Sequence, residues 1–227
     1  MITSRTTLVA LLGDPVEQSL SPRMQNAAFA ARGLDWAYVA LRVSADDLAD
    51  AARGLAALGF AGANVTTPHK LAAAELVGAG VPSVNTLVVG ADGSIDGSST
   101  DTAILDALTF ERAAIVGDGG AAAAFAHALP GASRFSRRTR WPPAIDDVDL
   151  VVHATSERDD VVLRVRRGQT LVDLPYPRTA TGAAAVEAGA RLVDGLDVLV
   201  AQGAASFETW TGVPAPVDVM RAAVRSA

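Results

Sequence analysis

Residues 112–129, with the sequence RAAIVGDGGAAAAFAHAL, join an apolar run, a glycine-rich turn and an alanine-rich run. The apolar run, Arg112 to Val116, predicts a strand, and the alanines predict a helix from Ala121 to about Leu129, because alanine is the strongest helix former. In the turn between them, residues 117–120, the backbone can approach a pyrophosphate while the helix N-terminus faces its negative charge. Glycines can also simply make a tight turn, so the prediction of a pyrophosphate site depends on the strand before the turn and the helix after it.

Apolar strand-like runs alternate with helical runs along the rest of the chain, which favours an α/β fold. Further strands are expected at residues 7–12, 37–43, 60–65, 133–137, 150–153 and 170–173, and further helices at about 21–32, 44–58 and most of 196–227. Ser21-Pro22 is typical of a helix N-cap, and Ser44 to Asp47 resembles a capping box. Residues 91–94 predict a hairpin turn.

The composition excludes several classes of protein. The chain has 227 residues, of which 50% are hydrophobic and 19% charged, so a globular protein with a sizeable core is expected. A net charge of -6 argues against a nucleic-acid partner. The absence of cysteine and the scattered histidines predict no metal site and leave the histidines structural or solvent-facing. Because no run reaches about 18 apolar residues, a protein without a membrane span, located in the cytoplasm, is expected.

Basic residues follow the strand expected at 133–137. A site for NAD usually offers an acidic residue there to the ribose, whereas this chain has Ser136, Arg137 and Arg138. Guanidinium groups suit the 2′-phosphate of NADP, and the alternative is a solvated basic turn.

Lys70 is the only lysine among the 19 basic residues. Lysine can lose its proton in a protein and arginine cannot, so Lys70 suits a site that passes a proton to or from a substrate oxygen. The alternative is a surface lysine without function. Ser19 and Ser21, which precede a predicted helix, can donate hydroxyls to a carboxylate beside a favourable dipole, although Ser21 alone is explained as a cap.

Seven segments occur in an order that resembles the shikimate dehydrogenase family, and together they cover nearly the whole chain. They are the serine segment 13–29, Asn64-Val65-Thr66-x-Pro68-x-Lys70, Val84-Asn85-Thr86, Asp96-Gly97-x-x-Thr100-Asp101, Gly117-x-Gly119-Gly120-Ala121, Asp173-x-x-Tyr176, and Gly195-x-x-x-Leu199-Val200-x-Gln202-Gly203.

The resemblance implies a residue for each step of substrate binding and catalysis. Ser19 and Ser21 are expected to hold the substrate carboxylate with Tyr176 nearby. Lys70 and Asp101 are expected to form the catalytic pair, because reduction of a ring ketone needs a proton at oxygen. The hydroxyl-binding residues are expected to be Thr66, Asn85 and Gln202. NADP(H) is expected as the cofactor, bound by Gly117, Gly119, Gly120, Ala121, Ser136, Arg137, Arg138, Thr155 and Gly195.

The resemblance also implies the architecture and the reaction. An α/β substrate domain is expected from residues 1–102 plus 198–227, with the C-terminal helices returning to it, and a Rossmann-like NADP domain with a parallel sheet from 103–197. The expected reaction is the reversible reduction of 3-dehydroshikimate to shikimate by a monomer or homodimer. The alternatives are a quinate/shikimate-type dehydrogenase that uses NAD, and a non-catalytic shikimate-binding protein with an impaired cofactor site.

Departures from the family pattern are concentrated in the predicted NADP domain. Residues 139–148, two of them prolines, separate the arginine turn (residues 136–138) from the next expected strand. This connection is too short for a usual helical crossover. An extended loop is therefore expected, leaving one face of the sheet thinly covered. After Thr155 the chain continues with Ser156 to Asp160, where the family has a proline and a Gly-Met pair.

Overall fold

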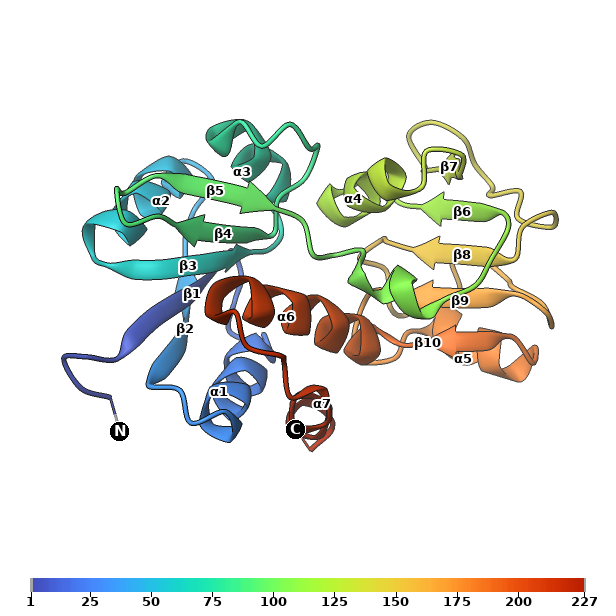
Figure 1. Cartoon of the computed structure of the whole chain (residues 1–227). Helices are drawn as coiled ribbons and strands as arrows, with labels where there is room; N and C mark the ends of the chain where they lie inside the picture. The colour runs from blue at the N-terminus through green and yellow to red at the C-terminus, as the bar shows by residue number, and fades with distance from the viewer. Residues whose placement is uncertain (1, 227) are drawn as a thin grey trace. The chain divides into compact units, whose positions relative to one another are not determined.

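The computed structural model describes residues 2–226, which form two compact units (Figure 1). The first unit contains the residues up to Thr100 together with those from Val200 onward, and the second contains Asp101–Leu199. Helix α6, Gly195–Thr211, begins in the second unit and ends in the first.

The first unit is built on a mixed five-stranded sheet with the order β2-β1-β3-β4-β5. Its first three strands are parallel and the last two antiparallel. The strands are β1 (Thr7–Gly13), β2 (Trp36–Arg42), β3 (Phe60–Val65), β4 (Thr86–Val89) and β5 (Ile95–Ser98). The other helices of this unit are α1 (Ser21–Ala31), α2 (Leu48–Ala57), α3 (Lys70–Val77) and α7 (Val217–Arg225).

Both faces of this sheet are buried. On one face, Leu48 and Leu55 of α2 and Ala73 of α3 pack with sheet residues such as Leu12 and Val65. Elsewhere in the unit, Phe29 of α1 stacks on Phe207 of α6, with ring centroids 5.3 Å apart. The two helices approach closely because position 203 is glycine: a Cβ there would lie 2.1 Å from the Met24 side chain.

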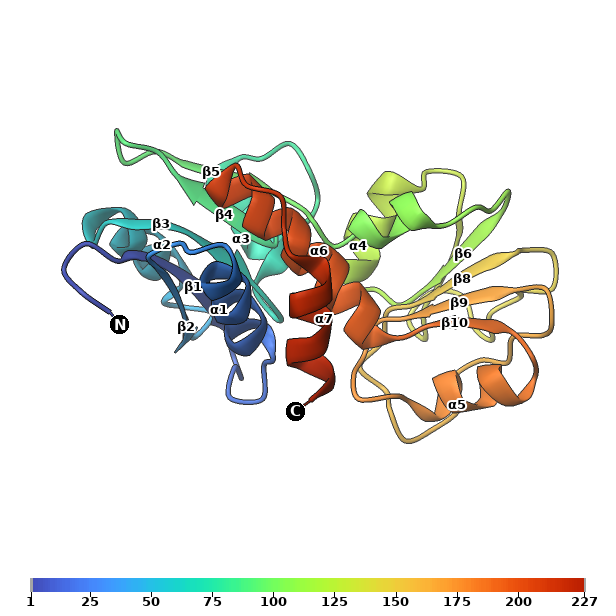
Figure 2. The same ribbon diagram turned by 60° about the horizontal axis from the view of Figure 1, so that its bottom comes forward.

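The second unit is built on an all-parallel sheet with the order β10-β9-β8-β6-β7. The strands are β6 (Ala113–Val116), β7 (Ser133–Phe135), β8 (Leu150–His153), β9 (Thr170–Asp173) and β10 (Arg191–Val193). Helices α4 (Gly120–Ala128) and α5 (Ala180–Glu187) lie on opposite faces of the sheet (Figure 2), and a 3-10 turn, η1, covers Ala103–Ala107.

The strands expected from the sequence are confirmed within two residues at each end, and the hairpin at 91–94 joins β4 and β5. The expected N-cap at Ser21 is wrong, since Ser21 is already helical and Leu20 occupies the cap position. The Asp47 N–H donates to Oγ of Ser44, as in a capping box, but the Ser44 hydroxyl donates to the Asp47 carboxylate and α2 begins only at Leu48. Helices α3 and α5 and strand β10 were not predicted from the sequence.

The crossover from β7 to β8 is extended, as predicted, with no helix between residues 139 and 149. The thin cover expected on that face is wrong, however. Ile145 of this crossover, with Leu163 and Val165 of the next connection, packs on fully buried sheet residues such as Val116 and Val151. Two extended segments therefore bury this face of the sheet, as a helix does in a usual parallel crossover.

Buried Gln169 satisfies backbone groups of these extended segments. Its Nε2 donates to the carbonyl oxygens of Ile145 (2.7 Å) and Val148 (2.8 Å), and its Oε1 accepts from the backbone N–H of Arg166. Because extended segments lack the internal hydrogen bonds of a helix, such side-chain partners are what allow them to be buried.

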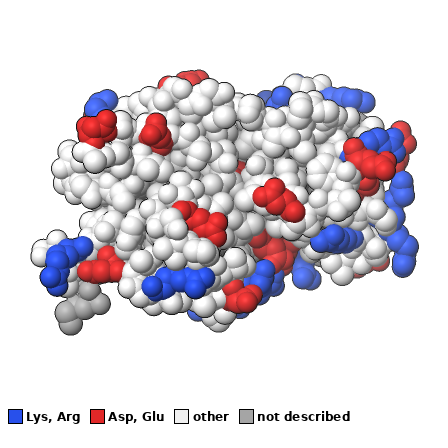
Figure 3. Space-filling model, in the orientation of Figure 1, with Lys and Arg blue, Asp and Glu red and all other residues white. Residues whose placement is uncertain are grey.

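Within residues 2–226, no helix is long and apolar enough to cross a membrane. The same residues contain no cluster of three or more histidine, aspartate or glutamate side chains placed to hold a metal ion. Figure 3 shows charged side chains of both signs scattered over a largely uncharged face.

Packing of the extended segments on the second sheet predicts that truncating two nearby residues has different effects on stability. Leu163 is 5% exposed and Val161 is 40% exposed. Leu163→Ala is expected to lower the free energy of unfolding by about 2–5 kcal/mol, the range for a buried leucine, and Val161→Ala by no more than about 0.5 kcal/mol. Urea denaturation followed by circular dichroism measures both. Equal, small losses in the two variants would show that the extended segments do not form part of the core.

Candidate functional site

The glycine turn after β6 has the backbone geometry that a nucleotide site requires. Gly117 has φ of +142°, and a Cβ there would lie 2.5 Å from the carbonyl oxygen of Ala154, so only glycine fits. Gly119 caps α4 in extended conformation, and a Cβ there would meet nothing within 4 Å. The N-terminus of α4, residues Gly120 and Ala121, thus begins beside open space, where its N–H groups and dipole favour an anion.

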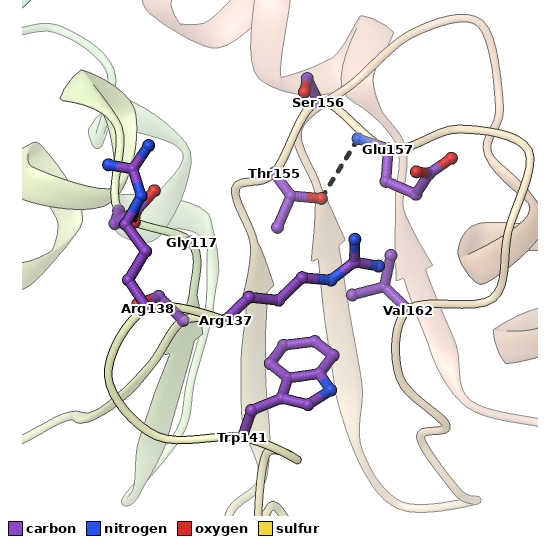
Figure 4. A pocket seen from close by; sticks show the side chains of 10 residues that line it. Gly117, Arg137, Arg138, Trp141, Thr155, Ser156, Glu157 and Val162 are labelled. Atoms are coloured by element: carbon purple, nitrogen blue, oxygen red, sulfur yellow. Dashed lines mark hydrogen bonds and ion pairs between the residues drawn. The ribbon is translucent and has the colours of Figure 1, made fainter.

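A pocket of about 260 Å³ lies at the carboxyl ends of three neighbouring strands (Figure 4). After β6 come Gly117 and Asp118, after β7 the arginine turn with Trp141, and after β8 the segment from Thr155 to Glu157, with Val162. Because β7 and β8 flank β6, the chain order reverses at β6, and such a switch point is where dinucleotides bind in open α/β sheets.

Two guanidinium groups face this pocket. The guanidinium of Arg137 lies 5.6 Å from the ring centroid of Trp141, and Nε of Arg138 lies 3.6 Å from Oδ2 of Asp118. Buried Ser136 shares a hydrogen bond of 3.0 Å with Thr139, which shapes the turn that carries them. Asp118 is thus paired with an arginine, and the turn retains the positive charge that the 2′-phosphate of NADP needs.

Glu157, on the opposite side of the pocket, is held as a carboxylate. Its Oε1 accepts hydrogen bonds from the backbone N–H groups of Asp159, Asp160 and Arg158. These bonds, with the Asp159 N–H foremost, hold the pKa of the Glu157 carboxyl below its usual range, and the positive charge of Arg137 acts in the same direction.

Thr155 connects the pocket to a buried polar chain. Its Oγ1 lies 2.6 Å from Nε2 of His153, whose Nδ1 lies 2.7 Å from Oδ1 of Asp173. His153 and Asp173 are buried, at 0% and 1% exposed. His153 is therefore buried rather than solvent-facing, which was one of the two interpretations open from the sequence. Its contact with Asp173 was missed because the two residues lie twenty positions apart in the chain.

Gly195, the remaining residue predicted to bind the cofactor, opens α6 in the second unit. A Cβ at this position would lie 2.3 Å from the carbonyl oxygen of Pro175. Packing of α6 against the segment after β9 therefore accounts for this glycine.

In the first unit, the ends of β1 and β3 bring several predicted residues to one edge of the sheet. Thr66 directly follows β3, and a Cβ on Gly13 would lie 2.3 Å from its methyl group. Lys70 is half-buried as the first residue of α3, and the preceding His69 is anchored by a 2.7 Å contact from Nε2 to the Val43 carbonyl oxygen. Where the chain enters α1, the N–H of its first residue, Ser21, donates to Oγ of Ser19 (3.2 Å).

Asn85 lies at the same edge, where β4 begins, and both ends of its carboxamide are fixed. Oδ1 accepts from the backbone N–H of Thr100 (2.7 Å) and the hydroxyl of Thr86 (3.0 Å). Nδ2 donates to Oγ1 of Thr100 (3.0 Å) and to Oε1 of Gln202 (3.3 Å). Two of the predicted hydroxyl-binding residues, Asn85 and Gln202, are thus in direct contact.

Ser206, which was not predicted from the sequence, connects these residues to α6. Its Oγ accepts from Nδ2 of Asn64 (2.9 Å), lies 2.9 Å from Oγ1 of Thr86, and donates to the carbonyl oxygen of Gln202 one turn earlier. The spacing from Gln202 to Ser206, which places both on one helix face, was the available signal. Asp101, buried, and Tyr176, half-buried, belong to the second unit.

Comparisons with known proteins all find one family, and the matched relatives align with nearly the whole chain. Residues 11–87 match the shikimate dehydrogenase substrate binding domain, and residues 195–225 match the shikimate 5′-dehydrogenase C-terminal domain. The chain is 41% identical to the shikimate dehydrogenase (NADP(+)) of Anaeromyxobacter dehalogenans, over 98% of this chain and 97% of that one. It is 38% identical to the protein of the same name from Moorella thermoacetica, over 100% of this chain and 95% of that one.

Solved structures give the same result. A shikimate dehydrogenase in complex with NADP+ matches with a TM-score of 0.86 and 29% identity, over 100% of this chain and 97% of that one. A shikimate 5-dehydrogenase from Thermus thermophilus in complex with NADP(H) and shikimate matches with a TM-score of 0.82 and 26% identity, over 97% and 99%.

The alignment with the Anaeromyxobacter protein also measures how short this chain is. It extends over 271 positions, whereas this chain has 227 residues. At least 44 positions of the alignment, the difference between these numbers, therefore have no residue in this chain.

The glycine turn predicts that replacement by alanine destabilises the protein at Gly117 and has little effect at Gly119. Gly117→Ala is expected to lower the free energy of unfolding by at least about 2 kcal/mol, because a side chain there is strained and collides with a backbone carbonyl. Gly119→Ala meets no atom and is expected to change it by less than about 0.5 kcal/mol, since the weaker cap is offset by a less flexible unfolded chain. Thermal and urea unfolding provide the comparison, and a wild-type-like Gly117→Ala would contradict it.

Proposed function

This chain belongs to the shikimate dehydrogenase family, and we propose that it catalyses the reversible, NADPH-dependent reduction of 3-dehydroshikimate to shikimate. The observation that carries the choice of cofactor is the pair Arg137 and Arg138, which lines a pocket at the switch point of a parallel sheet beside a glycine turn. Full-length similarity to relatives named for NADP(+) supports the same cofactor.

The residues of the second unit fit NADP(H), which supplies the hydride when bound. The glycine turn and the N-terminus of α4 would hold the pyrophosphate, and the arginine turn would hold the 2′-phosphate. Thr155, at the end of β8, would contact the nicotinamide half of the molecule. We propose residues 103–197 as the NADP domain.

We propose residues 1–102 plus 198–227 as the substrate domain. Ser19 and Ser21 would donate hydroxyls to the substrate carboxylate, with Tyr176 nearby, and Thr66, Asn85 and Gln202 would bind ring hydroxyls. Support comes from Asn85 and Gln202, which are already in contact, with Asn85 held by four hydrogen bonds. Because Thr100 fixes the Asn85 carboxamide, only the bond between Asn85 and Gln202 must give way to a ring hydroxyl, which limits the reordering that substrate binding requires.

Lys70 and Asp101 would act as the catalytic pair. The ammonium of Lys70 stands at the N-terminus of α3, where the positive end of the helix dipole adds to its stabilisation of a negatively charged oxygen. During reduction, Lys70 would give a proton to the developing alkoxide, and the Asp101 carboxylate would orient the ammonium and favour its reprotonation.

We further propose that the enzyme acts in the cytoplasm, where the NADPH that it consumes is regenerated, as a monomer or a homodimer. The edge strand β2, which carries the exposed Leu41, offers a surface on which a second copy could pair.

The role of Lys70 is tested by replacing it with a residue that keeps the charge but cannot release a proton. Lys70→Arg is expected to lower kcat by about 10²–10⁴-fold, the contribution of general acid–base catalysis, while calorimetry still detects shikimate binding. Turnover of 3-dehydroshikimate is followed by NADPH absorbance. Wild-type activity in Lys70→Arg would disprove the proton-transfer role. A wild-type protein that binds shikimate but oxidises neither NADPH nor NADH would refute the proposed reaction.

The role of Arg137 is tested by cofactor preference. Arg137→Ala is expected to weaken NADP+ binding roughly tenfold, as for the loss of one charge-assisted hydrogen bond, and to leave NAD+ binding unchanged. Arg134→Ala, an exposed arginine of β7 three residues earlier, is the matched control and should bind both cofactors like the wild type. Equal losses for NADP+ and NAD+ would place Arg137 away from the 2′-phosphate.

A further inference from the structure

A continuous chain of hydrogen bonds runs from the start of α5 to the pocket. The N–H of Gly182 donates to Oγ1 of Thr179 (2.9 Å), whose hydroxyl donates to Oδ2 of Asp173 (2.6 Å). The other oxygen of Asp173 meets Nδ1 of His153, and Nε2 of His153 meets Oγ1 of Thr155. Every member except Thr155 is buried inside the second unit.

The hydrogens along this chain can be assigned from its chemistry. The Thr179 hydroxyl has one hydrogen, and it points to Asp173 because its oxygen already accepts from Gly182. Imidazole is a stronger base than carboxylate, so the hydrogen shared by His153 and Asp173 stays on Nδ1. Asp173 thus fixes the orientation of the ring, with Nδ1 toward the carboxylate and Nε2 toward Thr155.

This contact fixes the Thr155 hydroxyl. Threonine has few side-chain rotamers, and Oγ1 is held by His153 on one side. On the other side it accepts from the N–H of Glu157 (3.2 Å), the bond drawn in Figure 4. A hydroxyl has one hydrogen and two lone pairs, so one hydrogen-bonding position remains for a ligand.

We propose that His153 is a positioning residue of the cofactor site: held by Asp173, it aims the Thr155 hydroxyl at a polar group in the nicotinamide half of NADP(H). This rests on the proposed function. The arginine turn after β7 takes the adenosine 2′-phosphate, and the glycine turn after β6 takes the pyrophosphate. Thr155 follows β8, on the other side of β6, so it meets the nicotinamide half.

Gly182 shows how tightly this chain is enclosed. Alanine is normally favoured over glycine within a helix, yet a Cβ at position 182 would lie 2.6 Å from Oδ2 of Asp173. The helix therefore has a glycine where the carboxylate needs room, which ties the position of Asp173 to the first turn of α5.

The test is a double-mutant cycle on NADP+ binding, measured by calorimetry without substrate. Thr155→Val is expected to weaken NADP+ binding roughly fivefold, as for one hydrogen bond. His153→Asn, whose amide N–H can still reach Asp173 but not Thr155, should have the same effect. The double variant should bind no more weakly than either single variant, and Thr155→Ser should restore wild-type binding. Thr170→Val, in β9, is the matched control.

A second ligand separates positioning from general damage. The fragment 2′,5′-ADP contains only the adenosine half, so all variants should bind it like the wild type. If His153→Asn weakens both ligands equally, or the double variant shows the product of the two losses, His153 has only a structural role and the proposal fails. If the variants bind NADP+ like the wild type, the proposal fails while the proposed function stands. A wild type that binds no NADP+ overturns both.

Nitrogen-15 NMR of the imidazole rings provides a measurement that does not need a folded His153 variant. Three histidines give signals, and that of His153 is expected to show hydrogen on Nδ1, whether the ring is neutral or charged. Hydrogen on Nε2 alone would require Asp173 to carry the shared proton and would overturn the assignment.

Discussion

The close approach of the β6 turn to the end of β8 is the constraint on which the second unit depends. Parallel pairing of β6 with β7 on one side and β8 on the other brings three carboxyl ends together. The pocket forms there only because Gly117 lets its backbone lie against the Ala154 carbonyl. One residue later Asp118 pairs with Arg138, so the same turn also helps to place a basic group.

The shortened crossover alters how this site is supported while keeping its position. Ile145, Leu163 and Val165 bury the face of the sheet from extended backbone, and Gln169 replaces part of the hydrogen bonding that a helix would contain. The connection after β8 then reaches α5, where the Val162 N–H donates to Thr181. Burial of apolar side chains, rather than regular secondary structure, is therefore what this face requires.

The sequence predicted what is local and missed what is distant. Strand–turn–helix order and the arginine turn were predictable, because each is encoded within about ten neighbouring residues. The burial of the second face was not, since Leu163 alternates with exposed residues in a stretch without strand pairing. His153 and Asp173 lie twenty residues apart, and their contact follows from the register of β8 on β9. The roles of Asn85 and Gln202, and the pairing of Lys70 with Asp101, came from the family resemblance and stay predictions.

The single lysine has a practical consequence. Reagents that acylate or reductively methylate amines usually modify many surface sites and report on none of them in particular. Here the chain offers one lysine side chain, half-buried at the first residue of α3, besides the terminal amine. An isotope-labelled methyl group introduced by such chemistry would give one side-chain resonance, which would act as a spectroscopic probe at the edge of the sheet where Thr66 and Asn85 lie.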